Sequence, residues 1–249
     1  NNVTDISGNG NNGFMSGFTS TSSAVVIGKL GQGLLFDGVN DAVSAGDIAG
    51  ADNIAQITIS VWTYVTSASE SSRTYVSKSH APTSSWALWK SASYYVFDVW
   101  NSSATLGEAL KSVGTQKGWM HVVGTYDGSN VRVYVNGIVG STVPALTGSV
   151  RDTTRFVCIA SFNLACGGVS ATTRLDDVRI YSRAISAVEA AALYKYGRNK
   201  TGSSQTAKPT TGNTLKNGLV GWWTMDGADV TANTTTDRSG QGNDGTRTA

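Results

Sequence analysis

The sequence predicts an all-β protein in which two antiparallel sheets pack as a sandwich. Short stretches with two-residue periodicity recur along the chain, and turn residues separate them about every 8–15 positions. Only one stretch has the features of a helix. Apolar residues make up 40% of the 249 residues and include seven Trp, which is ample for a packed core.

The composition limits the cellular compartments and the kinds of binding partner that are expected for the chain. Charged residues make up only 14% of the chain, against about 25% in an average soluble domain. Ser, Thr, Gly and Asn replace them, as is typical of secreted β proteins. The net charge of +2 comes from scattered Lys and Arg, so binding to nucleic acid is not predicted. No stretch approaches about 18 apolar residues, so no membrane span is predicted within the chain.

The strands are predicted from the alternation of side chains. In residues 56–65, Ile57, Ile59 and Val61 alternate with polar or aromatic residues. Residues 119–137 hold two alternating strands joined by a turn at 127–130, which predicts a hairpin. Further strands are predicted at 34–44, where an Asp-Gly turn divides two strands, and at 73–77, 86–90, 94–101, 138–143, 155–160 and 173–181.

The C-terminal part of the chain is predicted to hold a helix, a linker and one more strand. Ser186 and Glu189 are spaced as a capping box, and the helix is expected to end near Tyr196. Residues 198–217 are mostly Gly, Ser, Thr, Lys and Asn, which predicts a flexible linker. A strand at Gly218–Gly227 follows it.

A turn motif occurs twice, at Asp5–Gly13 and at Asp237–Gly245. Its residues favour tight turns, because Gly and Asn reach positive φ at low cost. Two copies in the same local order suggest that the chain begins partway into one repeat and stops shortly after entering the next. We therefore predict one domain at residues 1–197 and the start of a further repeat at 218–249.

An ordered series of motifs points to a known family. The series consists of Gly218–Gly227, the turn motif, Gly28–Gly38, Trp119–Gly128 and Leu175–Ala184. Together these motifs resemble the LamG-like jelly-roll domains of the concanavalin A-like lectin and glucanase superfamily. The resemblance implies an antiparallel two-sheet jelly roll with one short C-terminal helix, followed by a linker and the first strand of a next repeat.

The order of the motifs departs from the family in one respect. In the family, the strand that matches residues 218–227 opens the domain, whereas here it comes last. Residues 1–197 are therefore expected to lack a first strand, and an apolar sheet edge needs a partner. Either the chain is part of a longer tandem array, or residues 218–227 supply the strand. They could do so within one molecule, or in a neighbouring copy, joining subunits head to tail.

The two cysteines bear on the compartment. If Cys158 and Cys166 bridge the arms of a hairpin, closing the short loop contributes about 2–3 kcal/mol. The alternative is two free buried thiols. We predict the disulfide, which indicates an oxidising, extracellular setting.

Catalysis is not predicted. Glycosidases of the resembled superfamily need two carboxylates, usually in the pattern Glu-x-Asp-x-x-Glu, and none of the three glutamates stands in such a context. Asp176 and Asp177 are neighbours in a strand, which places them on opposite faces. Asp177 is expected to pair with Arg174 or Arg179, and His121 is expected to be a structural residue of a strand. No Gly-x-Ser-x-Gly elbow or Walker loop is present.

Calcium is the one metal that the sequence favours. Calcium takes about six to eight oxygen ligands, and Asp5, Asn9 and Asn11 alternate in the turn motif as in known calcium loops. The resemblance implies that an acid of the first strand, backbone carbonyls and an acid of the last strand hold a calcium. The corresponding acids here would be Asp226, or its upstream counterpart, and Asp176. The alternative is that all these acids only cap turns.

Sugar recognition would use aromatic faces flanked by polar groups. Tyr94, Val96, Asp98 and Trp100 share one strand face, and the acid argues against burial of that face in the core. The alternative is that most of these aromatic residues belong to the core. The candidate ligand-binding residues are Trp86, Trp89, Tyr94, Asp98, Trp100 and Asn101.

Two functions follow from these observations. The first is a non-catalytic module, extracellular or on the cell surface, that binds glycans or other cell-surface molecules and is stabilised by calcium. The second is a structural subunit of an extracellular array or filament, in which residues 218–227 complete the sheet of a neighbouring copy. The two differ in where that last strand docks.

Overall fold

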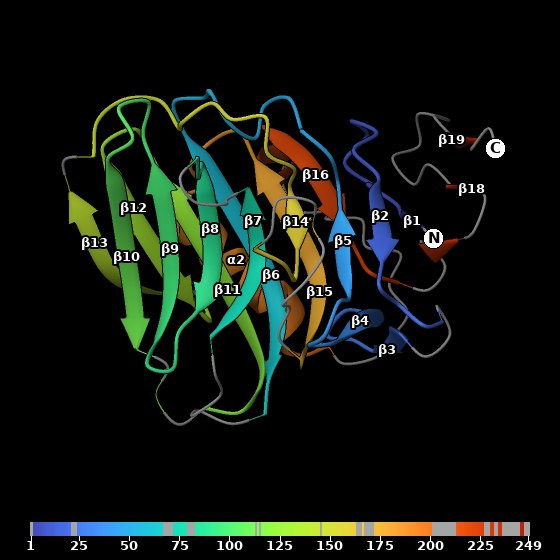
Figure 1. Ribbon diagram of the computed structural model, residues 1–249. Helices are drawn as coiled ribbons and strands as arrows, with labels where there is room; N and C mark the ends of the chain where they lie inside the picture. Colours follow the sequence, from blue (N-terminus) through green and yellow to red (C-terminus); the bar gives the residue numbers. More distant parts are fainter. Residues whose placement is uncertain are drawn as a thin grey trace.

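Two twisted antiparallel sheets lie face to face in the computed structural model (Figure 1). The predicted all-β sandwich with a short helix near the C-terminal end is confirmed. The structure describes residues 2–20, 24–66, 72–78, 83–112, 114, 116–144, 146–162, 166, 172–200, 213–226, 230–231, 234–235 and 245–246.

The first sheet faces the viewer in Figure 1 and contains nine strands. Its strands pair antiparallel with their neighbours. Their order is β10 (Leu106–Ser112), β9 (Tyr94–Trp100), β8 (Trp86–Lys90), β7 (Arg73–Lys78), β14 (Cys158–Ile159), β5 (Ala42–Ser44), β2 (Gly13–Ser16), β1 (Asn2–Val3) and β17 (Val230–Thr231).

The second sheet has eight strands and lies behind the first. Its order is β13 (Ile138–Pro144), β12 (Asn130–Val135), β11 (Gly118–Tyr126), β6 (Ile57–Val65), β15 (Thr172–Tyr181), β4 (Gln32–Asp37) and β3 (Val25–Ile27), and β16 (Leu219–Trp223) also pairs with β15. The short strands β18 (Thr234–Thr235) and β19 (Gly245–Thr246) pair with each other.

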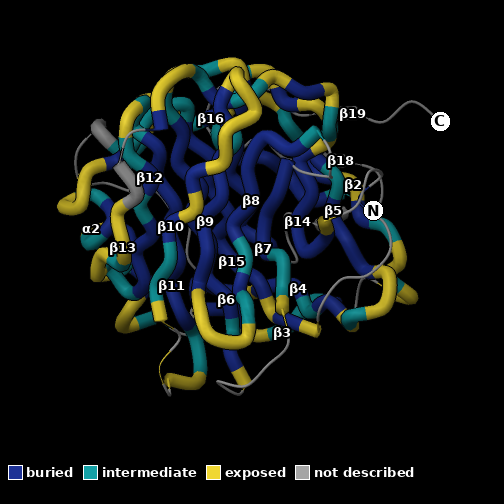
Figure 2. The backbone as a smooth tube through the Cα atoms, turned by 60° about the vertical axis from the view of Figure 1, so that its left-hand side comes forward, coloured by how far each residue is buried: buried dark blue, intermediate teal, exposed yellow. Residues whose placement is uncertain are grey.

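The core fills the space between the sheets, because each strand directs alternate side chains inward. Figure 2 shows buried residues along the strands and exposed residues in the loops. On β6, Ile57, Ile59 and Val61 enter the core, as their alternation predicts. Phe97 of β9 reaches across to Gly124 of β11, where an added Cβ would lie 2.2 Å from the ring. A glycine is therefore required at that close contact between the sheets.

Helix α2 (Ala187–Arg198) covers the outer face of the eight-stranded sheet. Ser186 and Glu189 form the predicted capping box, and the helix ends at Arg198 rather than near Tyr196. In the described part of the chain no helix is long and apolar enough to cross a membrane. The helix packs through an apolar cluster of Val123, Tyr134, Tyr181, Ile185, Ala190 and Leu193.

Strand β16 pairs with β15 of the same chain. Its register places Trp223 opposite Val178 and Gly221 opposite Ile180. Trp223 and Val220 enter the core, so β16 covers an apolar edge of the sandwich. Residues 201–212 of the predicted linker lie outside the described residues, as does the second turn motif apart from Gly245.

Side-chain periodicity did not predict several strands, among them β1, β2, β3 and β10. It also misjudged the length of one strand that it did predict. β10 has the sequence Leu-Gly-Glu-Ala-Leu-Lys-Ser, which lacks a β-branched pattern, and its pairing with β9 makes it a strand. Of the predicted strand 155–160, only Cys158–Ile159 is extended in the ladder. The flanking Val157 N–H donates to the Gly46 carbonyl instead.

The predicted strands around the Asp-Gly turn at 34–44 lie in opposite sheets. β4 belongs to the eight-stranded sheet and β5 to the nine-stranded sheet. The turn between them therefore carries the chain from one layer of the sandwich to the other rather than closing a hairpin.

Cys158 and Cys166 form a disulfide, with Cα atoms 5.2 Å apart. The cystine packs with Ala42 of β5. The Ser16 hydroxyl of β2 donates to the Cys166 carbonyl at 3.2 Å. The disulfide therefore fastens the segment after β14 to the nine-stranded sheet.

Candidate functional site

The outer face of β8 and β9 carries most of the predicted sugar-binding side chains. Tyr95, Phe97 and Val99 of β9 enter the core, so the residues between them face outward. No helix covers this face in the described part of the molecule. We call the outward-facing set the aromatic strip; it consists of Trp89, Tyr94, Asp98 and Trp100.

The aromatic strip is held together by one direct hydrogen bond. Trp89 of β8 lies opposite Val96 in the register, and its indole Nε1 donates to Asp98 Oδ2 at 2.8 Å. The side chains of Trp89 and Trp100 are half-buried, and Tyr94 is 43% exposed. The strip therefore presents aromatic surface to solvent around an oriented carboxyl group.

Asp98 is the electrostatically unusual member of the strip. The residue is only 7% exposed, and this burial raises the pKa of its carboxyl to about 7, with Glu108 adding to the increase. Glu108 stands directly opposite on β10. Asp98 Oδ1 is buried and accepts no hydrogen bond from an N–H or hydroxyl donor of the described residues, and its side-chain neighbour is the Glu108 carboxyl. A buried polar atom is costly to leave unpaired, and a proton shared with the Glu108 carboxyl would satisfy it.

Trp86 and Asn101 do not join the aromatic strip. Trp86 has no exposed surface and belongs to the core, and its indole Nε1 donates to the Ala51 carbonyl at 2.6 Å. Asn101 shapes a turn, because its Oδ1 accepts from the N–H groups of Ser103 and Thr105. The alternative of a core residue therefore applies to Trp86, whereas the role of Asn101 in a turn was not foreseen from the sequence.

The first turn motif binds strand β16 rather than gathering its side chains around one point. Both oxygens of Asp5 accept hydrogen bonds, from the Ser7 and Asn11 backbones, the Ser7 hydroxyl and the Trp222 N–H. The last of these bonds is 2.7 Å long and crosses to β16. Asp5 therefore acts as an acceptor that joins the two ends of the domain.

The two asparagines of the motif strengthen the same attachment. Asn9 Nδ2 donates to the Leu219 carbonyl and Asn11 Nδ2 to the Val220 carbonyl, both at 2.7 Å. Trp223 Nε1 donates in return to the Asn11 carbonyl at 2.9 Å. We call this set of contacts between the turn motif and β16 the terminal latch.

Asp176 and Asp226, the other predicted metal ligands, flank the loop before β4. Asp176 Oδ2 accepts from the Lys29 and Leu30 N–H groups at 2.6 and 2.7 Å, and Asp226 Oδ1 accepts from the Gln32 N–H at 2.6 Å. Asp176 Oδ1 is buried without a hydrogen-bond partner. Burial, Asp177 and Asp226 raise the pKa of Asp176 well above its usual range.

Asp176 and Asp226 alone do not complete a metal site. Among the described residues, no three His, Cys, Asp or Glu side chains gather as metal ligands. A cation beside Asp176 would therefore draw further oxygens from backbone carbonyls, which calcium accepts.

Asp177 joins β15 to β16 through a buried ion pair. Its Oδ1 accepts from Arg179 Nε and Nη2 at 3.0 and 2.9 Å and from Trp222 Nε1 at 2.6 Å. The Arg179 guanidinium lies 4.1 Å from the centre of the Trp222 ring. The expected pairing of Asp177 with an arginine is therefore made with Arg179, and it secures the last strand.

His121 has the structural role expected of it. It is buried, and its Nε2 lies 2.9 Å from the Ser60 hydroxyl. Burial, aided by the charge of Arg179, lowers the pKa of His121 to about 3. The imidazole is therefore neutral near pH 7 and too weak a base to take a proton there.

Sequence reasoning did not single out two groups that lie close to the aromatic strip. Glu108 becomes relevant only through the β9–β10 register, and β10 was not predicted as a strand. The segment Arg151–Arg155 begins beside Trp100, whose carbonyl accepts from the Arg151 N–H at 2.8 Å. The available signal was the concentration of charged and hydroxyl side chains in five successive residues of this segment.

The fold and these sites define a concanavalin A-like jelly roll. The sequence profile of the concanavalin A-like lectin/glucanase superfamily matches residues 37–191. The chain therefore belongs to this superfamily, and the resemblance expected from its motifs is confirmed. No curated protein sequence matches the chain.

Solved structures with a similar fold include toxin binding domains. The botulinum neurotoxin serotype G binding domain matches with a TM-score of 0.55 and 14% identity, over 77% of this chain and 48% of that one. The binding domain of Paraclostridial mosquitocidal protein 1 matches with a TM-score of 0.55 and 16% identity, over 71% and 47%.

A botulinum neurotoxin type C structure also matches, with a TM-score of 0.51 and 13% identity over 70% and 46% of the two chains. Cell entry of that toxin is described as dependent on interaction with two ganglioside molecules. The chain spans about half the length of the solved structures it matches. At these identities the likeness shows the fold alone.

Proposed function

We propose that this protein is a non-catalytic, secreted or cell-surface module that binds glycans through the aromatic strip. The observation that carries the proposal is the outer face of β8 and β9, which no helix covers among the described residues and where two half-buried indoles flank the oriented carboxyl of Asp98. Aromatic faces stack on the C–H surfaces of sugar rings, and a carboxyl group bonds their hydroxyls. The disulfide supports an oxidising compartment.

The superfamily and its structural neighbours support the same proposal. Lectins belong to this superfamily, and one of the similar structures is described by its interaction with gangliosides. These relations make a glycan the first ligand class to test, while the residues of the site come from this chain alone.

The arrangement of carboxyl groups favours binding over hydrolysis. Asp98 and Glu108 lie opposite each other, but Asp98 is nearly buried and its Oδ2 already accepts from Trp89. A retaining glycosidase needs an acid and a nucleophile that both reach the sugar, with carboxyl groups about 5–5.5 Å apart. A carboxyl so enclosed suits orientation of a hydroxyl better than attack on an anomeric carbon.

Binding to an array of surface glycans tests the proposal. We expect the full chain to bind a subset of glycans, and Trp100→Ala or Trp89→Ala to lower the affinity for the best of them at least tenfold by calorimetry. Trp119→Ala is the matched control, because Trp119 is a half-buried Trp of the other sheet that packs on Tyr64. Absence of glycan binding, or equal losses in all three variants, would refute the proposal.

We further propose that Asp176 and Asp226 hold a calcium ion. Asp176 Oδ1 is buried and has no hydrogen-bond donor, so a cation could bind to it. The neighbouring residues Asp177 and Asp226 add negative charge at this place. These features fit a hard cation, which would stabilise the local excess of carboxylates. Asp5, Asn9 and Asn11 are not included, since their contacts serve the terminal latch.

The alternative function, head-to-tail assembly, requires residues 218–227 to enter another copy. In this structure β16 completes its own chain's sheet and is held by the terminal latch. This docking favours a self-contained binding module. Head-to-tail assembly would appear in light scattering, at micromolar protein concentration, as particles with a mass greater than that of one subunit.

A further inference from the structure

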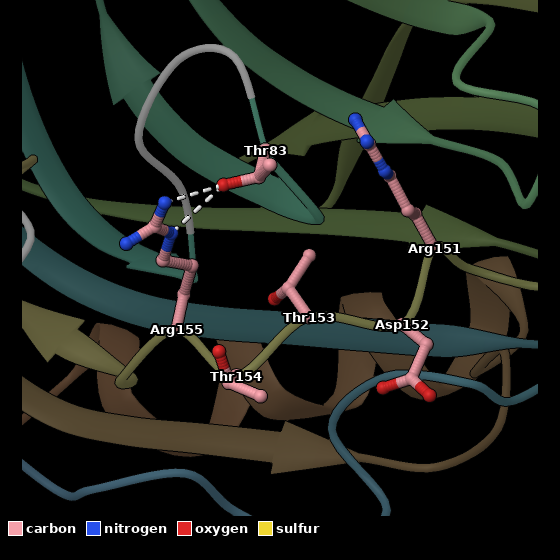
Figure 3. A pocket seen from close by; sticks show the side chains of 6 residues that line it. All are labelled: Thr83, Arg151, Asp152, Thr153, Thr154 and Arg155. Atoms are coloured by element: carbon pink, nitrogen blue, oxygen red, sulfur yellow. Dashed lines mark hydrogen bonds between the residues drawn. The ribbon is translucent and has the colours of Figure 1, made fainter.

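A second polar surface lies beside the aromatic strip, at the ends of the strands. It is a pocket of about 400 Å³ lined by Thr83, Arg151, Asp152, Thr153, Thr154 and Arg155 (Figure 3). Its volume is within the range of small-molecule sites, roughly 300–1,000 Å³. The segment that forms most of it, residues 151–155, lies between β13 and β14 in the chain, outside any strand.

Hydrogen bonds from neighbouring strands and loops hold the backbone of this segment in place. The Ser85 hydroxyl donates to the Arg151 carbonyl at 2.8 Å, and the Thr153 N–H donates to Asp52 Oδ2 at 2.8 Å. The buried ammonium group of Lys78 donates to the Arg155 carbonyl at 2.6 Å and lies 3.3 Å from Asp52. Such preorganisation lowers the entropic cost of binding, because the pocket is already shaped.

The side chains above this backbone are mostly hydroxyls and guanidinium groups. Arg155 Nε and Nη2 donate to the Thr83 hydroxyl at 2.9 and 2.6 Å. Figure 3 shows the third nitrogen of that guanidinium turned away from Thr83. A guanidinium has five N–H donors in a planar fork, which suits a carboxylate or a sulfate. With Arg151 and a single acid, Asp152, the lining carries a net positive charge.

Backbone hydrogen bonds connect the pocket segment to Trp100 of the aromatic strip. The Arg151 N–H donates to the Trp100 carbonyl, and the Trp100 N–H donates to the Ser85 carbonyl, both at 2.8 Å. These two bonds place the first residue of the pocket segment beside Trp100, so a glycan that stacks on Trp100 could extend towards the pocket. Thr83, Thr154 and Asp152 would bond hydroxyl groups there, while Arg155 would bond an anionic group.

We infer that this pocket binds the acidic sugar of a glycan whose neighbouring units lie on the aromatic strip. The inference rests on the proposed function and adds the ligand class, a saccharide that bears a carboxylate or a sulfate ester. Asp152 disfavours a free inorganic anion, because its own carboxylate repels one, whereas a sugar offers it hydroxyl donors.

The test compares acidic and neutral forms of the same oligosaccharides on the full chain. A hyaluronan hexasaccharide carries only carboxylates, and its carboxyl-reduced form is neutral. A carrageenan hexasaccharide carries only sulfates, and its desulfated form is neutral. We expect at least tenfold tighter binding of one acidic form than of its neutral counterpart. The pair that shows the preference identifies the anionic group.

Substitutions then locate the preference. Arg155→Gln and, separately, Arg151→Gln are expected to bring the ratio of acidic to neutral affinity close to one. Arg132→Gln, which removes an arginine that pairs with Asp127 in the other sheet, is expected to keep the ratio. Melting temperatures measured in parallel show whether each variant folds, and the two arginine variants provide independent readings.

The outcomes separate the two proposals. If the wild-type protein binds these or array glycans without an acidic preference, or if Arg132→Gln removes the preference as fully as Arg155→Gln, the pocket assignment is wrong and the aromatic strip stands. If no glycan binds, the proposed function fails and the pocket assignment fails with it.

Discussion

Asp98 shows at the level of one residue how a buried carboxyl group costs stability. Its carboxyl is nearly buried, and its pKa of about 7 lies well above the ordinary value of 3.8. In the unfolded chain the group ionises near pH 4, whereas in the folded protein it resists ionisation until about pH 7. The stability associated with its protonated form is therefore present below pH 4 and lost as the pH rises through 7.

Asp98→Asn is expected to relieve this cost. At pH 8 the substitution should raise the free energy of unfolding by roughly 2–4 kcal/mol, because Asn keeps an acceptor for Trp89 and carries no charge. At pH 3 we expect little gain. Urea denaturation at the two pH values measures the difference.

Asp127→Asn is the opposing control. Partial burial alone would raise the pKa of Asp127, but Arg132 and backbone N–H groups hold it below its usual value. Its ionised form is therefore favoured in the folded protein, and the substitution should lower stability at pH 8. An equal change at pH 3 and pH 8 for Asp98→Asn would contradict the burial argument.

At the scale of elements, the terminal latch joins the first turn motif to the last strand. Asp5 accepts four hydrogen bonds, one of them from β16. Two asparagine side chains bond the β16 carbonyls. The motif that the sequence suggests as a calcium loop thus also holds a strand, since its polar groups match the backbone of β16.

Asp5→Ala is expected to loosen β16. The loss of a buried multiple acceptor leaves several N–H groups unpaired, which should cost on the order of 3 kcal/mol. Hydrogen exchange should accelerate most in residues 219–223. Asp37→Ala is the control, because Asp37 also caps a tight turn, through the Val39 N–H, but does not contact β16. Uniform acceleration across both sheets would contradict a local latch.

The disulfide stabilises the segment after β14. Replacing both Cys158 and Cys166 with Ser should lower the free energy of unfolding by roughly 2–3 kcal/mol. The reason is that the unfolded chain regains the conformational entropy that closing this short loop removes. Glycan binding should persist, because the cystine packs on Ala42 and not on the aromatic strip. Thermal unfolding with and without reductant measures the first effect, and loss of binding would contradict the second.

Calcium would join the middle of β15 and the segment after β16, through Asp176 and Asp226, to the loop before β4. With the ion at about 100 times its dissociation constant, we expect chelation to lower the melting temperature by about 5–10 °C. Asp226→Asn should remove this response, whereas Asp37→Asn should keep it. An unchanged melting temperature of the wild-type protein after chelation would count against the site.

At the scale of the whole molecule, the fold followed from the sequence more fully than the site did. The two-residue alternation of β6 and the turn residues of the β11–β12 hairpin are local signals, and both elements formed as predicted. Alternation also placed Asp98 and Trp100 on one face. It could not show that Trp86 faces the core, because periodicity does not say which side of a strand is buried.

The remaining features depend on contacts between distant segments. Asp5 and Trp222 meet across the whole chain, and the register of β9 and β10 brings Glu108 opposite Asp98. The pocket of Arg151 and Arg155 is shaped by Lys78 and Asp52 from other loops and strands. No local pattern encodes such meetings, so only the folded structure reveals them.

The most direct test of a glycan-binding surface on β8 and β9 is the affinity of the full chain for its best array glycan, measured by calorimetry before and after Trp100→Ala. We expect binding in the wild-type protein and at least a tenfold loss in the variant, with Trp119→Ala unchanged. Binding that survives Trp100→Ala at full strength would place the glycan elsewhere and contradict the central claim.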